Sequence, residues 1–183
     1  MRSVRAWWLF MGLAVLGFVV VGYWFSDSRF ARQIIEERKL STPEQVFQFV
    51  IDQKVQAPPG SPAHGGESFR QLMARDGWLW CDEGAVSIAV LAWQLGYQTQ
   101  LVDLIGKSDG ISHHTVMQVL QKDGWVTYDF TGRGFGMTPE KTVDYESTVR
   151  VRHYPQWWHR LLLNNYFLRV MAQRVRPLVD AYL

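Results

Sequence analysis

The stretch "GWLWCDEGAVSIAVLAWQLGYQTQLV", Gly77 to Val102, combines the only cysteine of the chain with a strongly apolar helical pattern. Asp82 to Leu95 is apolar on nearly every side, which predicts a helix buried at the centre of the fold rather than one lying on its surface. Gly96 is well placed to end this helix, and the alternating residues that follow predict a strand. Cys81 therefore stands at the head of a central helix.

Cys81 has a position that can make a thiol reactive. Backbone N–H groups in the first turn of a helix lack intrahelical acceptors, and the helix dipole places partial positive charge near the sulfur. Both effects stabilise the thiolate, which is the nucleophilic form of cysteine. Asp82 and Glu83 suit a helix N-terminus but add negative charge that opposes the thiolate. These effects alone leave open whether Cys81 is a nucleophile or an inert core thiol.

Two further predicted strands supply a base and an acid. "SHHTVMQV" places His113 and His114 at the head of one strand, and "GWVTYDF" places Asp129 at the end of the next. An imidazole can take the thiol proton or stand beside the thiolate as imidazolium, and a carboxylate can orient it. "QKDG" between the strands indicates a hairpin. A two-residue hairpin loop pairs residues whose numbers sum to an odd value, so His114 and Asp129 share a sheet face and His113 lies on the other.

The register of this hairpin stays open. A loop centred on residues 121–122 would place Asp129 directly opposite His114. A turn centred on residues 123–124 would place Asp129 opposite Gln118 instead, about 13 Å along the strand from His114 at roughly 3.3 Å per residue. The shared face is therefore a firmer prediction than direct contact.

The same residues do not predict a metal site. His113 and His114 are neighbours on a strand and point to opposite faces, and Cys81 has no second cysteine to offer a paired ligand. We expect neither a metal ion nor a cofactor.

Taken in order, these pieces resemble the transglutaminase-like superfamily. The residues that carry the resemblance are "WCDEGAVSIAVLAWQLGYQTQLVDL", "HHTVMQV" and "GWVTYDFT", within about Pro43 to Gly136. The resemblance implies an α+β fold with a papain-like core, in which a buried cysteine-bearing helix packs on an antiparallel sheet. It also implies a Cys-His-Asp triad, with Cys81 as nucleophile, His114 as base and Asp129 as orienting acid.

Two positions depart from the pattern of that superfamily. Many members have an aromatic residue directly after the cysteine, whereas here Asp82 follows and Trp80 precedes. The position two after the histidine is often tryptophan, and here it is Val116. The oxyanion-stabilising group is therefore open. Trp80 and the backbone N–H of Cys81 are candidates for it, and His113 is a further candidate for the substrate cleft.

An uncharged apolar block occupies residues 7–25, after Arg2 and Arg5. At 1.5 Å per residue it would reach about 28 Å, roughly the hydrocarbon thickness of a bilayer, and it has tryptophan and tyrosine at its ends, as interfaces prefer. Residues 1–25 are therefore predicted to be a transmembrane anchor. The alternative is a cleaved signal peptide, for which the apolar region is long and Ser26 to Ser28 is a poor cleavage site.

The charges around this block favour one orientation. Arg2 and Arg5 indicate a cytoplasmic N-terminus, although basic residues also follow the block closely. We expect a single-pass protein of the inner membrane with its domain in the periplasm, outside the cytoplasm. In such an oxidising compartment the lone cysteine cannot form an internal disulfide, so it needs another reason to be present.

The rest of the chain divides into three parts. Residues 26–41 are predicted to be a helical spacer, and residues 42–152 the transglutaminase-like domain, which starts with a helix capped by "TPEQ" and ends with a strand at Ser147–Arg152. Residues 153–183 repeat apolar positions at helical spacing with arginines between them. This predicts a C-terminal amphipathic helix that docks on the domain or lies on the membrane surface.

The composition narrows the function. The chain is 48% hydrophobic and 20% charged with a formal net charge of +2, which indicates neither nucleic-acid binding nor disorder. The first hypothesis is a membrane-anchored thiol enzyme that cleaves or transfers an acyl group at an amide bond of a peptide or protein. The alternative is a non-catalytic module that uses the same fold to bind a peptide or another envelope protein.

Overall fold

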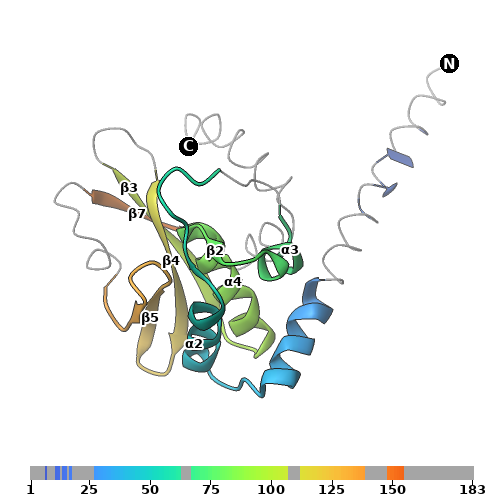
Figure 1. Cartoon of the computed structure of the whole chain (residues 1–183), viewed down its shortest axis with the longest axis horizontal. Coiled ribbons are helices and arrows are strands. Elements are labelled where there is room, and N and C mark those ends of the chain that lie inside the picture. Colours follow the sequence, from blue (N-terminus) through green and yellow to red (C-terminus); the bar gives the residue numbers. More distant parts are fainter. Residues whose placement is uncertain are drawn as a thin grey trace.

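The computed structural model describes residues 27–62, 67–106, 112–138 and 148–154, with a few isolated positions before residue 18. Within these ranges the fold is mixed α+β, with helices packed on an antiparallel sheet (Figure 1). The labelled elements are α2 (Pro43–Gln53), β1 (Val55–Gln56), α3 (Phe69–Ala74), β2 (Trp78–Leu79), α4 (Cys81–Gln94), β3 (Thr99–Gly106), β4 (Ser112–Gln121), β5 (Gly124–Asp129), β6 (Gly134–Phe135) and β7 (Thr148–Tyr154). The predicted fold class is confirmed at this level.

Two sequence predictions fall mainly outside this description. The apolar block at residues 7–25 is described at scattered positions only, and the terminal segment from residue 155 is not described. Among the residues that the structure describes, no helix has the length and hydropathy needed to span a bilayer.

The sheet has the strand order β6-β5-β4-β3-β7, and every neighbouring pair is antiparallel. The predicted strand at Ser147–Arg152 appears as β7, beside β3. The short strands β1 and β2 form a separate parallel pair, in which Gln56 aligns with Leu79. Because Leu79 lies two residues before Cys81, this pair of strands positions the backbone that leads into the cysteine.

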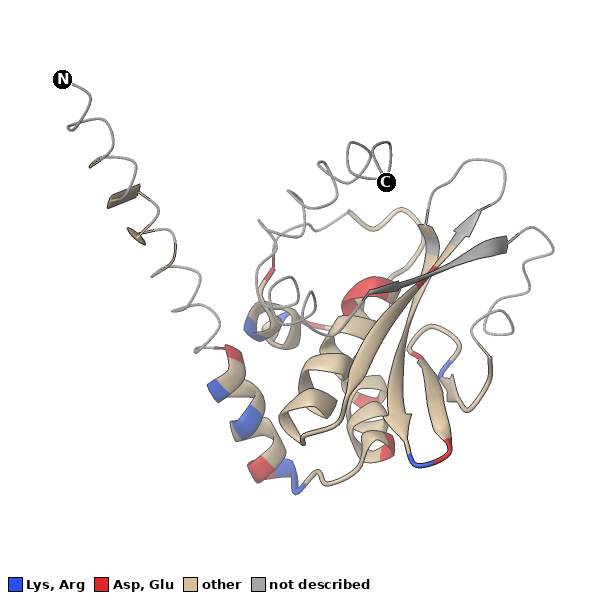
Figure 2. Cartoon of the chain, turned by 180° about the vertical axis from the view of Figure 1, so that it is seen from behind, with Lys and Arg blue, Asp and Glu red and all other residues tan. Residues whose placement is uncertain are grey.

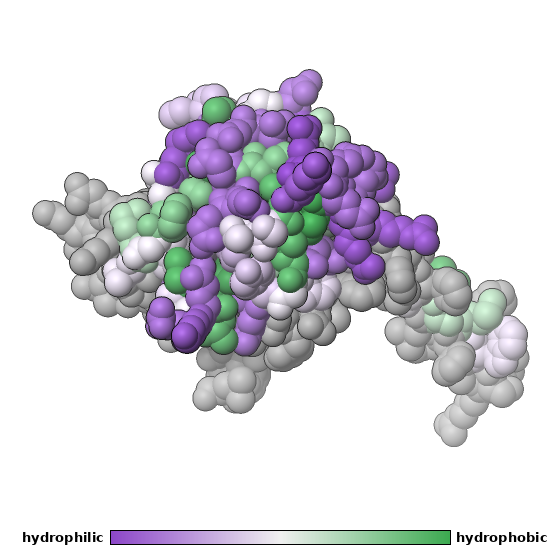
Figure 3. Space-filling model, turned by 90° about the horizontal axis from the view of Figure 1, so that it is seen from below, coloured by the Kyte–Doolittle hydropathy of each residue, from purple (hydrophilic) through white to green (hydrophobic). Residues whose placement is uncertain are grey.

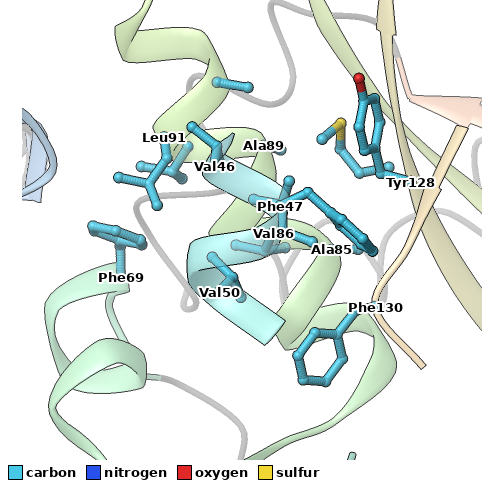
Figure 4. Close-up of a cluster of buried hydrophobic side chains, with 14 of the residues drawn as sticks. Val46, Phe47, Val50, Phe69, Ala85, Val86, Ala89, Leu91, Tyr128 and Phe130 are labelled. Atoms are coloured by element: carbon cyan, nitrogen blue, oxygen red, sulfur yellow. The ribbon is translucent and has the colours of Figure 1, made fainter. Parts of the chain in front are cut away.

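Helix α4 is the centre of the fold, as its sequence predicts. Its residues from Glu83 to Ala92 are all buried, and it contacts α2, α3 and the sheet strands β3, β4 and β5. Gly96 takes φ +93°, a conformation that L side chains rarely adopt, and ends the helix at the predicted place. Side chains of α2, α3, α4 and the end of β5 meet in one core (Figure 4).

A glycine allows α4 to approach β5 closely. A Cβ at Gly84 would overlap the ring of Phe130, the residue directly after β5. Phe130 is buried in the same core as α4 (Figure 4). The first turn of α4 therefore lies directly against the end of the strand that carries Asp129.

Helix α2 begins where its cap residues predict, with one difference. The Thr42 hydroxyl accepts the N–H of Gln45 at 3.3 Å, and Pro43 occupies the first helical position. The Gln45 side chain, however, accepts the N–H of Ser41 at 2.8 Å rather than that of Thr42. The contact from Gln45 back to the residues before the helix is therefore made one residue earlier than the "TPEQ" pattern predicts.

The predicted spacer is helical at residues 27–38, but it also belongs to the core. Ala31 and Ile34 are buried against the other helices, while acidic and basic residues are spread along this helix (Figure 2). The buried carboxylate of Asp27 accepts the N–H groups of Phe69 and Arg70 at 2.9 and 3.4 Å, at the start of α3. Burial raises the pKa of this carboxyl, against the effect of these hydrogen bonds.

On the face seen in Figure 3, hydrophilic residues surround small separate areas of apolar surface. Such scattered apolar side chains are ordinary on a solvated surface. In the described part of the chain, the exposed large hydrophobic residues of the domain are Val55, Leu120, Trp125, Phe135 and Met137.

Candidate active site

The β4–β5 hairpin brings His114 and Asp129 together. Its two-residue loop is at residues 122–123, midway between the two loops that the sequence leaves open. One step beyond the last pair of this ladder, Asp129 stands across from Val116 and diagonal to His114. Diagonal neighbours are about 7–8 Å apart at the backbone, within reach of long side chains. The predicted shared face is confirmed.

The two side chains are hydrogen-bonded in a buried environment. His114 Nε2 lies 3.0 Å from Asp129 Oδ1, and the side chains are only 4% and 1% exposed. Asp129 Oδ1 also accepts the backbone N–H of Thr131 at 3.0 Å, which fixes the carboxylate. Because Asp129 engages Nε2, Nδ1 is the ring nitrogen that remains for the cysteine.

Cys81 meets this pair from α4. It is the first residue of the helix and a half-buried free thiol, and its side chain is hydrogen-bonded to His114. Burial lowers the pKa of His114, but the hydrogen bonds to Asp129 and Cys81, with the charges of these two groups, raise it to about 9. His114 is therefore an imidazolium at neutral pH, between a carboxylate and the sulfur. The three residues singled out from the sequence lie together.

Glu83 does not act as the free negative charge that the sequence suggests. The Arg75 guanidinium contacts both of its carboxylate oxygens. Glu83 Oε2 also accepts the backbone N–H of Trp80 at 2.9 Å. The acid two residues after the cysteine is thus neutralised, and it holds the Leu79–Trp80 peptide, one residue before the cysteine. The position of Glu83 in the first helical turn is a sequence signal for such a contact, whereas nothing in the sequence points to Arg75.

Trp80 uses its indole N–H within the protein. Nε1 donates to the backbone oxygen of Pro62 at 3.2 Å, and the ring meets Trp78 edge to face. This donor is therefore engaged, which leaves the backbone N–H of Cys81, in the first turn of α4, as the better oxyanion candidate. His113 is the extra residue of a bulge in β4 opposite Leu104 and Ile105; its side chain lies outside the described part, so its predicted place in the cleft stays a prediction.

A polar contact that the sequence does not reveal joins β1 to the aspartate loop. Thr131 Oγ1 donates to Gln56 Oε1 at 2.8 Å, while the N–H of Thr131 donates to Asp129. Since Gln56 pairs with Leu79 just before Cys81, β1 links the cysteine side of the site to the histidine and aspartate side.

Within the described ranges, no group of three or more His, Cys, Asp or Glu residues is arranged to hold a metal ion. The chemistry available to these side chains is that of a thiol, an imidazole and a carboxylate in hydrogen-bonded series. Such a series activates a thiol for attack on a carbonyl carbon.

No protein-family model matches the chain, and no curated protein matches it significantly in sequence. The resemblance to transglutaminase-like proteins therefore rests on Cys81, His114 and Asp129 and on the residues around them in the sequence.

Proposed function

We propose that this protein is a thiol enzyme of transglutaminase-like type, which cleaves or transfers an acyl group at an amide bond of a peptide or protein. One observation carries the proposal: the buried His114 imidazole is hydrogen-bonded both to Asp129 and to Cys81 at the head of α4. A structural thiol needs neither a basic partner nor an orienting carboxylate. Three such groups in series supply a nucleophile, a proton carrier and an orienting charge.

The geometry supports a two-stage reaction. The Cys81 thiolate attacks the amide carbonyl carbon, and the backbone N–H of Cys81 donates to the oxygen that becomes negative. The C–N bond breaks as His114 gives its proton to the leaving amine, which leaves a thioester on Cys81. Water or a second amine then attacks the thioester while His114 accepts its proton, which releases an acid or a new amide and restores the thiolate.

The charge state of His114 fits this sequence of steps. With a pKa of about 9, His114 holds the proton in the resting site at neutral pH, ready for the leaving amine. Asp129 keeps the ring oriented through Nε2 throughout the cycle.

The test combines labelling with catalysis. The full chain is treated with iodoacetamide, the adduct is mapped by mass spectrometry, and release of amines from a peptide library is followed with wild type and Cys81→Ala. We expect selective alkylation at Cys81 and loss of turnover in Cys81→Ala. Absence of selective labelling, together with equal turnover of the two proteins, would overturn the proposal. A peptide that binds equally well to both proteins and is never cleaved would favour a non-catalytic binding module.

We further infer, from the sequence, that residues 7–25 anchor this domain in the inner membrane with the active site in the periplasm. The apolar length and aromatic ends support this location. Protease added to spheroplasts should digest a C-terminal epitope tag without lysis. A tag that is digested only after lysis would place the domain in the cytoplasm.

A further inference from the structure

A buried ion pair stands at the entrance to the cysteine helix. The side chains of Arg75 and Glu83 are 14% and 6% exposed, and Arg75 also binds Glu67 at 2.6 Å on its more exposed side. The guanidinium lies 4.5 Å from the centre of the Trp78 ring, and its Nε donates to the Trp78 carbonyl at 3.2 Å. Arg75 is thus held on several sides.

The backbone of Arg75 is fixed as well. The buried Lys54 Nζ donates to the carbonyls of Met73 and Arg75, at the end of α3. Burial lowers the pKa of Lys54, followed by the effect of the nearby Arg75 charge. The chain therefore keeps two cations close together at this point, and the charge of Asp76 acts on Lys54 in the opposite direction to that of Arg75.

Largely buried ion pairs often add little to the free energy of unfolding. The loss of hydration of two charges offsets much of their attraction, so apolar residues of similar volume often serve the fold equally well. The Arg75–Glu83 pair has a local effect on the chain that leads to Cys81. Arg75 neutralises the carboxylate that accepts the N–H of Trp80, one residue before the nucleophile.

An unpaired Glu83 carboxylate would disfavour the thiolate form of Cys81. His114 from β4 contacts Cys81, Asp129 from β5 contacts His114, and Asp82 and Glu83 follow Cys81 on its own helix. Of these groups, only His114 carries positive charge. A like charge in the same helical turn disfavours ionisation of a thiol, in a direction opposite to the effect of the helix N-terminus.

We propose that Arg75 is a positioning residue of the Cys81 site, which acts through Glu83 to fix the Leu79–Trp80 peptide and to cancel a negative charge in the first turn of the cysteine helix. The inference deepens the proposed function and rests on it, since it assigns a role to the environment of the nucleophile. Arg75 touches neither the sulfur nor a substrate in this role. Its influence is electrostatic and passes through one carboxylate.

The experiment measures the rate of iodoacetamide alkylation of Cys81 against pH in the full chain. We expect Arg75→Met to move the midpoint of the pH–rate profile upward by about one pH unit, the size of shift that a like charge nearby produces. The double variant Arg75→Met/Glu83→Gln should bring the midpoint back to within a few tenths of wild type. Arg75→Lys, which keeps the charge and loses the forked contact, should fall between wild type and Arg75→Met.

The matched control is Arg70→Met. Arg70 is another arginine of the same segment that lies over an aromatic ring, here Phe30 at 4.8 Å, and no contact joins it to Glu83. Its replacement should leave the alkylation midpoint unchanged. Circular dichroism at each pH checks that every variant is folded. If Arg75→Met fails to fold, Arg75→Lys and Glu83→Gln decide: an upward shift in the first and none in the second support the proposal.

Two results overturn it. The first is that folded Arg75→Met has the same midpoint as wild type. If Arg75→Met does not fold, the same result in Arg75→Lys overturns the proposal. The other is a double variant whose midpoint stays raised, because the cause would then not be the Glu83 charge. Alkylation does not require turnover. A midpoint governed by Arg75 in a protein that cleaves no peptide would therefore retain this inference while removing the proposed catalytic function.

Discussion

The two sides of the site are held in different ways. The chain before Cys81 is held by a charged network, in which the largely buried Arg75 joins Glu83 and the more exposed Glu67. His114 and Asp129 depend on the backbone ladder of β4 and β5 and are almost fully buried. Charge changes should therefore tune the cysteine side, whereas the histidine and aspartate side should respond to changes in packing and register. The two sides meet where Gly84 packs on Phe130.

The largest effect is expected where these two sides touch. Gly84→Ala would normally stabilise a helix by about 1 kcal/mol, but here the added methyl overlaps the Phe130 ring. We expect the free energy of unfolding to fall by about 3 kcal/mol, the upper part of the range for overpacked cores. Urea denaturation measures it. In Gly84→Ala/Phe130→Ala the loss should be smaller than the sum of the single losses; additive losses would show that the two residues do not conflict.

The second prediction concerns the pH dependence of the buried side. The pKa of His114 is raised from 6.5 to about 9, so its protonated form contributes stability that is complete below about pH 6.5 and is lost as the pH rises through about 9. At 1.36 kcal/mol per unit, the contribution is at most about 3 kcal/mol. Urea denaturation between pH 6 and 10 should show wild type losing more stability than His114→Gln. Parallel curves for the two proteins would contradict the pairing.

The third prediction tests how finely Asp129 is placed. A Cβ at Gly132 would lie 2.5 Å from Asp129 Oδ2, so Gly132→Ala should push the carboxylate away from His114. We expect turnover to fall about 100-fold, as for misplacement of a catalytic group by about 1 Å. Gly134→Ala is the control, because its Cβ would meet the flexible end of the Met137 side chain at 3.2 Å and the Gly132 carbonyl oxygen at an ordinary 3.8 Å, and no atom of Asp129 within 4 Å. Equal turnover in both variants would mean that Asp129 is not oriented by close packing.

The smallest effect is expected far from both sides. Thr42→Ala removes the hydroxyl that caps α2, which should cost about 1 kcal/mol of stability and leave the alkylation rate of Cys81 unchanged. Thermal unfolding and iodoacetamide kinetics measure the two quantities. A change in alkylation that accompanies this small loss would show that the site responds to global stability rather than to its own contacts.

Local patterns predicted much of this fold. Helix α4 is apolar on all sides, so its central burial followed from sequence, as did its end at Gly96. In a hairpin with a two-residue loop, the numbers of paired residues sum to an odd value. This rule predicted that His114 and Asp129 share a face of the sheet. The register could not be predicted, because residues 121–124 allow several turns. Gly124, with φ +122°, closes the loop as the first strand residue rather than lying at the turn centre.

Contacts between distant elements could not be predicted. Arg75 precedes β2 and Glu83 follows it, and no sequence pattern identifies the two residues as partners. The bond between Gln56 and Thr131 joins residues 75 positions apart, and it forms only once β1 has paired beside the cysteine helix. Such pairings depend on tertiary packing, whereas apolar periodicity reports only on the faces of single elements.

The contact of Asp27 with the start of α3 limits how far the domain could travel if residues 7–25 anchor it as proposed. Were residues 27–38 a free chain, the domain would sample a span of roughly 20 Å from its point of attachment, at about 5–6 Å times the square root of the residue number. As a helix with its first carboxylate buried in the fold, this segment gives no such freedom. A domain tethered to a bilayer just before Asp27 would stay close to its surface, and whatever it binds would have to reach it within that narrow layer.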